Sequence, residues 1–407
     1  MKIVIFEDSH CTNLYPLGLF CPLYEVSIGS WTLHSMVNLL DVPVLTAVRK
    51  HLQFNNVEKN ITEAIGNDPI LFLNASIEPG VCYLEILKDI VKSGDPFIST
   101  SGNRVSAALI PPEKRLPENI STLEISPHLL EMELPLEREM FKTIDWPHES
   151  VGSHLKLFRS NIEKVISTGN YQEKQPGVFT GENVTLAPTA VIETRDGPVI
   201  IDSGVNIMHF TYLEGPIHIG SNSTIIEHSS LKDQTSIGPR CKIGGEIEAS
   251  TIDSLSNKQH HGFLGHSWVG KWVNLGAGTS SSDLKNTYGK IRVEYNGNKF
   301  ETGMQFIGSV IGDYAKTAVN TSLFTGKIVG VCSMIYGTVT TNVPSFSNYA
   351  RSFGQVTEIS IEQIMKTQAR MFLRRDVKQT ERDRALMKSV FELTLHERTI
   401  SEEQINF

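Results

Sequence analysis

A six-residue repeat in the second half of the chain constrains its fold more than any other feature. Aliphatic residues occupy every sixth position over eight repeats: Ile201, Ile207, Leu213, Ile219, Ile225, Leu231, Ile237 and Ile243. With aliphatics at about a fifth of all residues, chance would give this register on the order of once in a million starting points. The period returns further on, at Ile311, Thr317, Leu323, Val329 and Ile335.

A period of six matches neither the 3.6 residues of an α-helix nor the 2 of an amphipathic strand. A short flat strand followed by a turn does have this period, with each aliphatic side chain pointing inward onto its neighbours in adjacent coils. Glycine follows the aliphatic residue at Ile219, Ile237, Ile243 and Ile311, where the chain must turn a corner. We therefore predict a parallel β-helix over residues 178–345. The alternative, a β-sandwich, would repeat its strands every eight to twelve residues.

Residues 1–170 have the pattern of an α/β domain. Short apolar runs predict buried strands at Ile3–Phe6, Val42–Val48 and Ile70–Leu73. Helical patterns lie between and after them, at Thr32–Leu40 and Tyr83–Lys92. Alternating strands and helices predict a mostly parallel sheet. Residues 111–137 are rich in Pro and Glu, and we expect irregular loops there.

Bulk composition excludes several classes of function. The net charge is −8, which disfavours nucleic-acid binding because that needs a basic face. Apolar runs are too short for a membrane span, and Glu7 and Asp8 end the first one too early for a signal peptide. The five cysteines form no C-x-x-C pair, so we expect neither zinc nor disulfides, as in a cytoplasmic protein.

Residues 358–407 are predicted to form a helical tail, with a capping box over Ser360–Gln363. A basic patch follows at Arg370, Arg374, Arg375 and Lys378. Two interpretations of the patch stay open at this point. It is either a solvated helix face on the end of the β-helix, or a contact for an anionic cosubstrate.

The six-residue register fails between Ile243 and Leu264, because the 21 residues between these positions are not a multiple of six. Local departures from a regular pattern often mark functional sites. The segment 257–265 (N-K-Q-H-H-G-F-L-G) lies inside this slip, and 274–279 (N-L-G-A-G-T) follows it. The polar stretch 282–289 then predicts an excursion from the prism.

The residue types in these segments suit acyl transfer to a phosphorylated acceptor. A neutral histidine accepts a proton near pH 7, and Lys258 and Lys285 would neutralise a phosphate. Asn side chains and backbone N–H groups would hold a carbonyl or an oxyanion. The alternative is that His260 and His261 only bond to local backbone, but the register slip and the two lysines favour function. No Cys or carboxylate accompanies the histidines at a spacing typical of metal ligands.

Three segments carry a resemblance to a known family. Residues 274–279 match N-[IL]-G-A-G-T, 258–265 match K-x-H-x-G-F-L-G, and 285–288 are similar to an N-Y segment. The chain resembles the bifunctional N-acetylglucosamine-1-phosphate uridyltransferase/glucosamine-1-phosphate acetyltransferase family. More closely, it is similar to a divergent bacterial branch with a short, altered nucleotidyltransferase half. The resemblance covers nearly the whole chain and is strongest over 255–340.

The resemblance implies a left-handed β-helix, a homotrimer with active sites between neighbouring prisms, and acetyl-CoA as cosubstrate. Counted from the 274–279 match, the family's catalytic base falls on His260 and its substrate tyrosine on Phe263, which lacks the hydroxyl. The remaining substrate-binding positions implied are Lys258, Asn274, Lys285, Asn286 and Tyr288. The cofactor-binding positions implied are Gly276, Ala277 and Thr321.

The amino-terminal half departs further from the family. The glycine-rich nucleotide loop is absent, and the branch's P-L-x-x-x-R-P and E-L-R-x-G segments carry Cys21 and Ser27 in place of arginine. Losing a bidentate phosphate ligand puts uridyl transfer from UTP in question. Asp8, at the end of the first predicted strand, is a weak candidate to hold Mg²⁺, which only an active nucleotidyltransferase would need.

The first hypothesis is therefore acetyl transfer from acetyl-CoA to an amino-sugar 1-phosphate, as in UDP-N-acetylglucosamine biosynthesis. A second is sugar-1-phosphate nucleotidyl transfer, with the β-helix as a trimer scaffold. A third is a catalytically inactive regulator that binds sugar nucleotides, favoured by Cys21, Ser27 and Phe263. All three involve small-molecule ligands, and none involves a nucleic acid or a membrane.

Overall fold

The computed structural model describes residues 1–53, 68–117, 120–295 and 297–398. The chain forms two compact units, Met1–Glu149 and Ser150–Phe407. The sequence placed the first boundary near residue 170, whereas nearly all of helix α5 (Glu149–Thr168) falls in the second unit. Positions 118–119 of the predicted loop region and 399–407 of the predicted tail lie outside the described residues.

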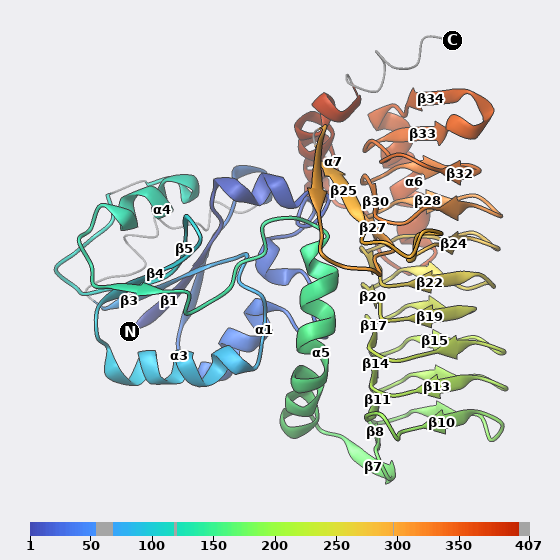
Figure 1. Cartoon of the computed structure of the whole chain (residues 1–407), viewed down its shortest axis with the longest axis horizontal. Helices are drawn as coiled ribbons and strands as arrows, with labels where there is room; N and C mark the ends of the chain where they lie inside the picture. The colour runs from blue at the N-terminus through green and yellow to red at the C-terminus, as the bar shows by residue number, and fades with distance from the viewer. Residues whose placement is uncertain (54–67, 118–119, 296, 399–407) are drawn as a thin grey trace. The chain divides into compact units, whose positions relative to one another are not determined.

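A mixed sheet forms the core of the first unit (Figure 1). Its strands lie in the order β2 (Val44–Ala47), β1 (Lys2–Phe6), β3 (Ile70–Asn74), β5 (Arg104–Ile110), β4 (Phe97–Ser101) and β6 (Leu136–Arg138). Strands β2, β1 and β3 are parallel, as predicted. Strand β5 runs antiparallel to β3 and to β4. The β4–β5 pair must be antiparallel, because a connection of two residues can only close a hairpin.

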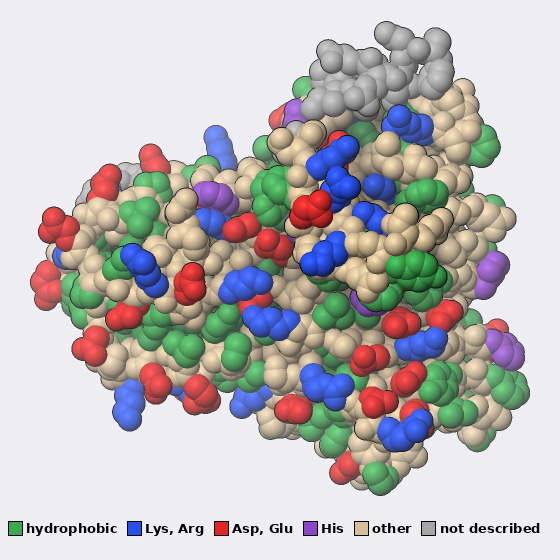
Figure 2. All heavy atoms as spheres, viewed as in Figure 1, with side chains coloured by type: hydrophobic (Ala, Val, Ile, Leu, Met, Phe, Trp, Pro, Cys, Tyr) green, Lys and Arg blue, Asp and Glu red, His purple; other side chains and the backbone are tan. Residues whose placement is uncertain are grey.

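Among its described residues, the first unit has the helices α1 (Leu33–Val37), α3 (Cys82–Ser93) and α4 (Thr122–Leu130). Short 3₁₀ segments are η1 (Ser9–Leu14), η2 (Leu23–Glu25), η3 (Asn38–Leu40) and η4 (Lys50–Leu52). The predicted strands and helices are thus confirmed to within a few residues. On the face shown in Figure 2, acidic and basic side chains are interspersed over this unit.

The expectation of irregular loops over 111–137 is wrong for its central part, which forms helix α4. Ser121 caps this helix, and its backbone N–H donates to the Glu124 carboxylate at 3.0 Å in a capping box. Ile125 and Leu129 are buried in the core of the unit. The proline content of the segment concealed this pattern, because Pro127 itself lies inside the helix.

The second unit is a β-solenoid whose coils stack along three faces (Figure 1). The first face contains β7 (Gln172–Gln175), β8 (Val178–Thr180), β11 (Val199–Ile201), β14 (Ile217–Ile219), β17 (Thr235–Ile237), β20 (Thr251–Ile252), β23 (Trp268–Val269), β27 (Ser309–Ile311) and β30 (Lys327–Val329). The third face contains β10 (Val191–Glu193), β13 (Tyr212–Glu214), β16 (Ser230–Leu231), β19 (Glu246–Glu248), β22 (Phe263–Gly265), β24 (Ser280–Ser281), β29 (Ser322–Leu323) and β32 (Thr338–Val339).

The second face is interrupted. Its lower part contains β9 (Thr185–Leu186), β12 (Asn206–Ile207), β15 (Thr224–Ile225), β18 (Lys242–Ile243) and β21 (Asn257–Lys258). Its upper part contains β28 (Lys316–Thr317), β31 (Met334–Ile335), β33 (Ser347–Ala350) and β34 (Gln355–Glu358), with the 3₁₀ segment η5 (Arg351–Phe353) between the last two. Single-residue bridges through Asn274 join the two parts.

The repeated aliphatic residues form the solenoid core. Every one of the eight predicted from Ile201 to Ile243 is at most 2% exposed. Parallel register places equivalent residues over one another, as in the pairs Ile201 with Ile219 and Ile219 with Ile237. The solenoid therefore matches the left-handed β-helix fold that the resemblance implied. The predicted excursion is also present, with a hairpin formed by β25 (Arg292–Tyr295) and β26 (Asn298–Glu301).

The tail contains helices α6 (Ile361–Leu373) and α7 (Glu381–Leu393). Ser360 caps α6, where its hydroxyl accepts a 3.3 Å hydrogen bond from the Gln363 backbone. Near its end, α6 packs on the solenoid through Phe372, whose ring lies 4.7 Å from that of Trp272. This contact holds the end of α6 against the second face, beside the interruption.

Candidate functional site

The register slip has a structural basis in coils of unequal length. Ile219 pairs with Ile237, so that coil has 18 residues, but Ile237 pairs with Ile252 and closes a coil of 15. The next coil, from Ile252 to Val269, has 17 residues. Segment 257–265 lies in these shortened coils, where the six-residue register of the interior positions is broken.

Lys258 occupies one of these interior positions. It pairs in register with Ile243, so its side chain points into the prism, and it is 2% exposed. Its ammonium donates hydrogen bonds to the carbonyl oxygens of His260 at 2.9 Å and Gly244 at 3.4 Å. Burial lowers its pKa to about 8. Lys258 thus supports a turn from inside and does not present its charge at the surface.

The turn between β21 and β22 carries His260 and His261, and both side chains are exposed. Gly262 adopts φ +123°, and a Cβ there would lie 2.1 Å from the carbonyl oxygen of Thr279, so glycine is required. The carbonyl of His261 accepts a 3.1 Å hydrogen bond from the Gly278 N–H. The backbone of the turn is therefore fixed, while the His260 ring faces solvent.

Segment 274–279 lies next to the turn that carries His260 and His261. The side chain of Asn274 is exposed, and its Oδ1 accepts a 3.3 Å hydrogen bond from Asn257. A Cβ at Gly276 would lie 2.7 Å from the backbone of Ala318, so adjacent coils approach too closely for any side chain. The hydrogen bond from Gly278 to His261 joins this segment to the histidine turn.

The predicted cofactor-binding positions differ in accessibility. Gly276 and Ala277 are half-buried, and the Ala277 carbonyl accepts a 2.7 Å hydrogen bond from the Asn320 N–H. The side chain of Thr321 is fully buried and donates to the Ala318 carbonyl at 2.9 Å. Thr321 therefore contributes to coil packing in this chain.

The remaining predicted substrate residues lie in or beside the excursion. Phe263 is half-buried at the start of β22, and its N–H donates to Ser280 Oγ at 3.2 Å. Lys285 is half-buried, with its ammonium on the Lys290 carbonyl at 2.7 Å. Asn286 and Tyr288 are exposed. Among the described residues, no hydrogen bond or ion pair joins Lys285, Asn286 or Tyr288 to His260.

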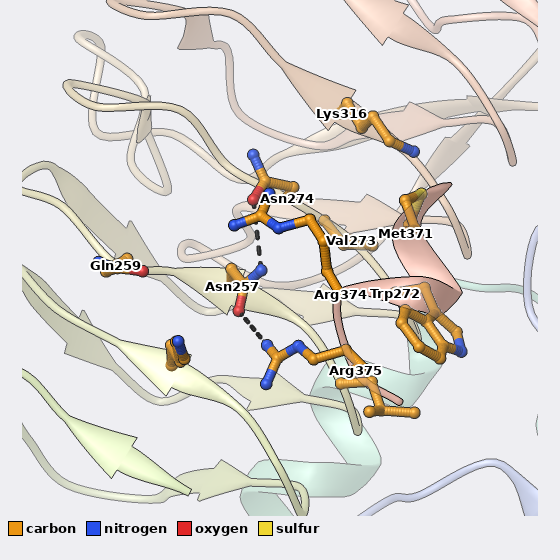
Figure 3. A pocket seen from close by; sticks show the side chains of 11 residues that line it. Asn257, Gln259, Trp272, Val273, Asn274, Lys316, Met371, Arg374 and Arg375 are labelled. Carbon is orange, nitrogen blue, oxygen red and sulfur yellow. Dashed lines mark hydrogen bonds between the residues drawn. The ribbon is translucent and has the colours of Figure 1, made fainter. Parts of the chain in front are cut away.

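A pocket of about 230 Å³ opens where the end of α6 meets the interrupted second face (Figure 3). Its cationic lining residues are Lys242, Lys316, Arg374 and Arg375. Its amide-bearing lining residues are Asn257, Gln259 and Asn274. Gln259 immediately precedes His260, so the pocket adjoins the turn that carries the candidate base.

Two of the four residues in the predicted basic patch line this pocket, and the other two do not. Arg374 and Arg375 line the pocket, whereas Arg370 and Lys378 are exposed and do not. Figure 3 shows Arg375 directed at Asn257, whose Oδ1 accepts its 2.6 Å hydrogen bond. Sequence alone did not identify Lys242 or Lys316, because their alignment on one face depends on the unequal coil lengths.

The sequence interpretation also missed a histidine–aspartate pair. His266 Nδ1 lies 2.8 Å from Asp283 Oδ2, and both residues are half-buried. The His266 ring stacks on Phe306 with centroids 5.1 Å apart. Asp283 belongs to the polar stretch singled out in the sequence, but nothing in the spacing indicated His266 as its partner. The pair fixes the start of the excursion.

In the first unit, Asp8 is buried and engaged by protein groups. Its two oxygens accept hydrogen bonds from Arg104 at 2.9 and 3.0 Å, and Asn74 donates to one of them at 2.8 Å. Burial raises the pKa of Asp8, but the Arg104 and Asn74 interactions outweigh it and hold that pKa below its usual value. Asp8 therefore neutralises Arg104 here.

The neighbouring Glu7 is also paired with a buried arginine. Its carboxylate accepts from the Arg49 guanidinium at 2.9 and 3.0 Å, and Arg49 also donates to the Gly18 carbonyl at 2.5 Å. Arg49 is 6% exposed. It lies close to the segment that carries Cys21 and Ser27, but its guanidinium is occupied by Glu7 and by backbone.

Over the described ranges, no group of three or more His, Cys, Asp or Glu side chains is placed to hold a metal ion. Among the helices that the structure describes, none is both long and apolar enough to cross a bilayer.

The fold and site define the class of protein, which joins a nucleotidyltransferase-like α/β unit to a hexapeptide-repeat β-helix. Residues 3–168 match the family model described as sugar nucleotidyl transferase. This part of the chain is thus similar to sugar nucleotidyl transferases, and the chain is similar to bifunctional GlmU proteins over much of its length, at modest identity. The predicted family resemblance is confirmed.

Two curated relatives illustrate the extent of this similarity. A bifunctional sugar-1-phosphate nucleotidylyltransferase/acetyltransferase of Sulfurisphaera tokodaii is 32% identical over 142 residues, 34% of this chain and 35% of the relative. A bifunctional protein GlmU of Clostridium botulinum is 26% identical over 282 residues, 68% of this chain and 54% of the relative. The chain therefore spans about half of the length of these relatives, or less.

Two solved structures are similar to this chain at low TM-scores. An Arabidopsis UDP-N-acetylglucosamine acyltransferase has a TM-score of 0.28 and 14% identity, covering 47% of this chain and 74% of its own. A point mutant of AntD, an N-acyltransferase of Bacillus cereus, was solved with dTDP and coenzyme A. It has a TM-score of 0.22 and 13% identity, covering 51% of this chain and 100% of its own. At these scores neither structure bears on function here.

Proposed function

We propose that this protein transfers an acetyl group from acetyl-CoA to the amine of an amino-sugar 1-phosphate, with His260 as general base. One observation carries the proposal. The exposed His260 ring sits on a turn whose backbone is fixed by Lys258 from inside and by Gly278 of the N-L-G-A-G-T segment from outside. Both curated relatives are bifunctional, and one is named as an acetyltransferase.

The chemistry requires little beyond positioning and proton transfer. The amine nitrogen attacks the thioester carbonyl, a C–N bond forms, and the C–S bond breaks to release the coenzyme A thiolate. His260 takes the proton that leaves the nitrogen and returns it to the thiolate. Asn274 and nearby backbone N–H groups would position the acceptor and the acetyl oxygen. Lys258 would act through the turn, because its ammonium is buried.

The test is release of free coenzyme A from acetyl-CoA with glucosamine 1-phosphate. We expect His260→Ala to lower turnover by about 10²–10⁴, the usual contribution of a general base. His261→Ala is the matched control, since the same change is made one residue away on the same turn. Equal turnover in the wild type and His260→Ala would refute the assignment of the base. The family resemblance implies a homotrimer, and light scattering would test that expectation here.

A second candidate is sugar-1-phosphate nucleotidyl transfer, which the family match over 3–168 favours. Its signature would be Mg²⁺-dependent release of pyrophosphate from UTP with a sugar 1-phosphate. Arg49 and Arg104 are each held by a buried carboxylate, and Cys21 stands where the branch has arginine. Binding of a sugar nucleotide without turnover would instead support a regulatory role for this unit.

A further inference from the structure

The outer surface of the second face carries a row of polar residues in register. Lys242 pairs with Asn257, Asn257 with Asn274, and Asn274 with Lys316. Because side chains at paired positions of parallel strands point the same way, these four groups line one surface. The end of α6 adds Arg374 and Arg375 beside this row, which closes the pocket of about 230 Å³ (Figure 3).

The positive charges of this pocket are not balanced by carboxylates. Within the described part of the chain, none of the four cationic lining residues makes an ion pair, and no Asp or Glu lines the pocket. Arg375 donates to an amide oxygen, and Lys316 donates to the Tyr314 carbonyl at 2.8 Å. Elsewhere on the same unit, cations do find partners, as Lys232 does with Glu246 at 2.5 Å.

The cationic side chains around this pocket repel one another, which a bound anion would relieve. Arg240 adds a fifth cation at the rim, where it donates to the Arg375 carbonyl at 2.8 Å. Burial and the like charges of Arg240 and Arg374 lower the pKa of Arg375, and burial lowers that of Lys316 to about 8. In a chain of net charge −8, clustered unpaired cations indicate a site that a bound anion would neutralise.

We propose that this pocket binds a phosphate-bearing small molecule through Lys242, Lys316, Arg374 and Arg375, with the amides of Asn257 and Asn274 as neutral partners. Guanidinium groups bind phosphate oxygens in pairs, and lysine ammonium groups add compact charges. The volume suits a phosphate or pyrophosphate together with a small attached group. The site lies apart from Lys258 and Lys285, and of the sequence-predicted basic patch it takes only Arg374 and Arg375.

Isothermal titration calorimetry on the full chain tests this binding without requiring turnover. The probes are inorganic pyrophosphate, glucosamine 1-phosphate against glucosamine, and coenzyme A against dephospho-coenzyme A. The pocket variant is Arg374→Gln with Arg375→Gln. The control variant is Arg370→Gln with Lys378→Gln, which removes the same charge from the same region outside the pocket. Lys242→Gln, at an exposed position, is a second pocket variant should the first be unstable.

We expect the pocket variants to weaken at least one phosphate-bearing probe about tenfold or more, since hydrogen bonds to charged groups are lost. The control should change affinity less than about twofold. Selective weakening of glucosamine 1-phosphate would identify an acceptor phosphate. Selective weakening of coenzyme A, absent for dephospho-coenzyme A, would identify the 3′-phosphate of the donor. Weakening of pyrophosphate alone would identify a general phosphate site.

Wild-type affinities retained by both pocket variants for every probe, or no binding of any probe to the wild type, would overturn the proposal. The outcome is separable from the acetyltransferase proposal, because His260→Ala should lose turnover yet keep the affinity of the pocket. Conversely, unchanged binding in the pocket variants would leave a His260-dependent reaction standing.

Discussion

The buried ammonium of Lys258 donates a 2.9 Å hydrogen bond to the backbone carbonyl of His260. A lysine at an interior position of a β-helix replaces an aliphatic residue of the core column, since its register partner is Ile243. The cost of burying its charge is offset only in part by two carbonyl oxygens. This arrangement makes Lys258 a positioning residue for the turn that carries the candidate base.

Lys258→Met should therefore change the turn as well as the core. We expect a fall in the acetyl-transfer kcat of about tenfold or more with a smaller change in KM, because the turn loses its internal donor while the His260 side chain remains. Ile243→Met is the matched control in the same column, and volume-conserving swaps of this kind cost less than about 1.5 kcal/mol. Equal loss of kcat in both variants would show that general core disruption, rather than support of the turn, is responsible.

The depressed pKa of Lys258 predicts a pH dependence of stability. The pKa is about 8 in the folded chain against an ordinary value of 10.5, so between these pH values the unfolded chain binds more protons. The free energy of unfolding of the wild type should rise relative to Lys258→Met as pH increases from about 8 to 10.5. Denaturant unfolding at several pH values would measure this, and a constant difference over that range would contradict the lowered pKa of the buried lysine.

Gly262→Ala should destabilise the solenoid locally. A residue with φ +123° is strained by about 1–3 kcal/mol if it is not glycine, and the Cβ would also meet the Thr279 carbonyl oxygen at 2.1 Å. Gly289→Ala, in the excursion, is the control, because the nearest atom to its Cβ would be 3.7 Å away. Thermal unfolding should show a lower Tm for Gly262→Ala and little change for Gly289→Ala. Equal Tm values would mean that the turn relaxes more freely than its contacts indicate.

The sequence predicted the fold closely where a repeated physical constraint acts at every position. Ile201 to Ile243 had to be buried in a regular column, and they are. Lys258 could not be placed from sequence, because its inward direction follows from coils of 15 and 17 residues rather than 18. The pocket was also inaccessible to sequence reasoning, since it unites Lys242 with Arg375 through the packing of α6. The basic patch itself was recognised, but not which of its members face inward.

Asp8→Ala should reduce the stability of the first unit, with or without magnesium. Arg104 is 3% exposed, and removing Asp8 leaves its buried charge with only the half-exposed Asp145, so we expect a loss of about 3–5 kcal/mol. Asp145→Ala removes the half-exposed second partner of Arg104, and we expect about 0–1 kcal/mol. Hydrogen exchange of peptides from residues 1–149, measured in EDTA, would compare the two. Unchanged protection in Asp8→Ala would return Asp8 to consideration as a metal ligand.

Asp313, in the solenoid, predicts a pH dependence of stability that is opposite in sign to that of Lys258. Burial raises its pKa to about 7, while its Oδ1 accepts a 2.7 Å hydrogen bond from the Lys271 N–H. Between about pH 4 and 7 the folded chain therefore binds more protons at this group than the unfolded chain, so its contribution to stability falls as pH rises. Asp313→Asn keeps the accepting oxygen and cannot ionise. Its free energy of unfolding, relative to wild type, should rise from pH 4 to pH 7 and level off above.

Asp202→Asn is the control for this pH series. Although burial raises the pKa of Asp202, its interactions with His218 and Tyr171 outweigh that effect and hold the pKa below its usual value of 3.8. Its stabilising contribution is present above the unfolded value and is lost only as pH falls through the lower folded value. The difference between Asp202→Asn and the wild type should thus stay nearly constant from pH 4 to 7. A rising difference in both variants would point to a change common to any Asp-to-Asn replacement, whereas a rise confined to Asp313→Asn would locate the proton in the solenoid core.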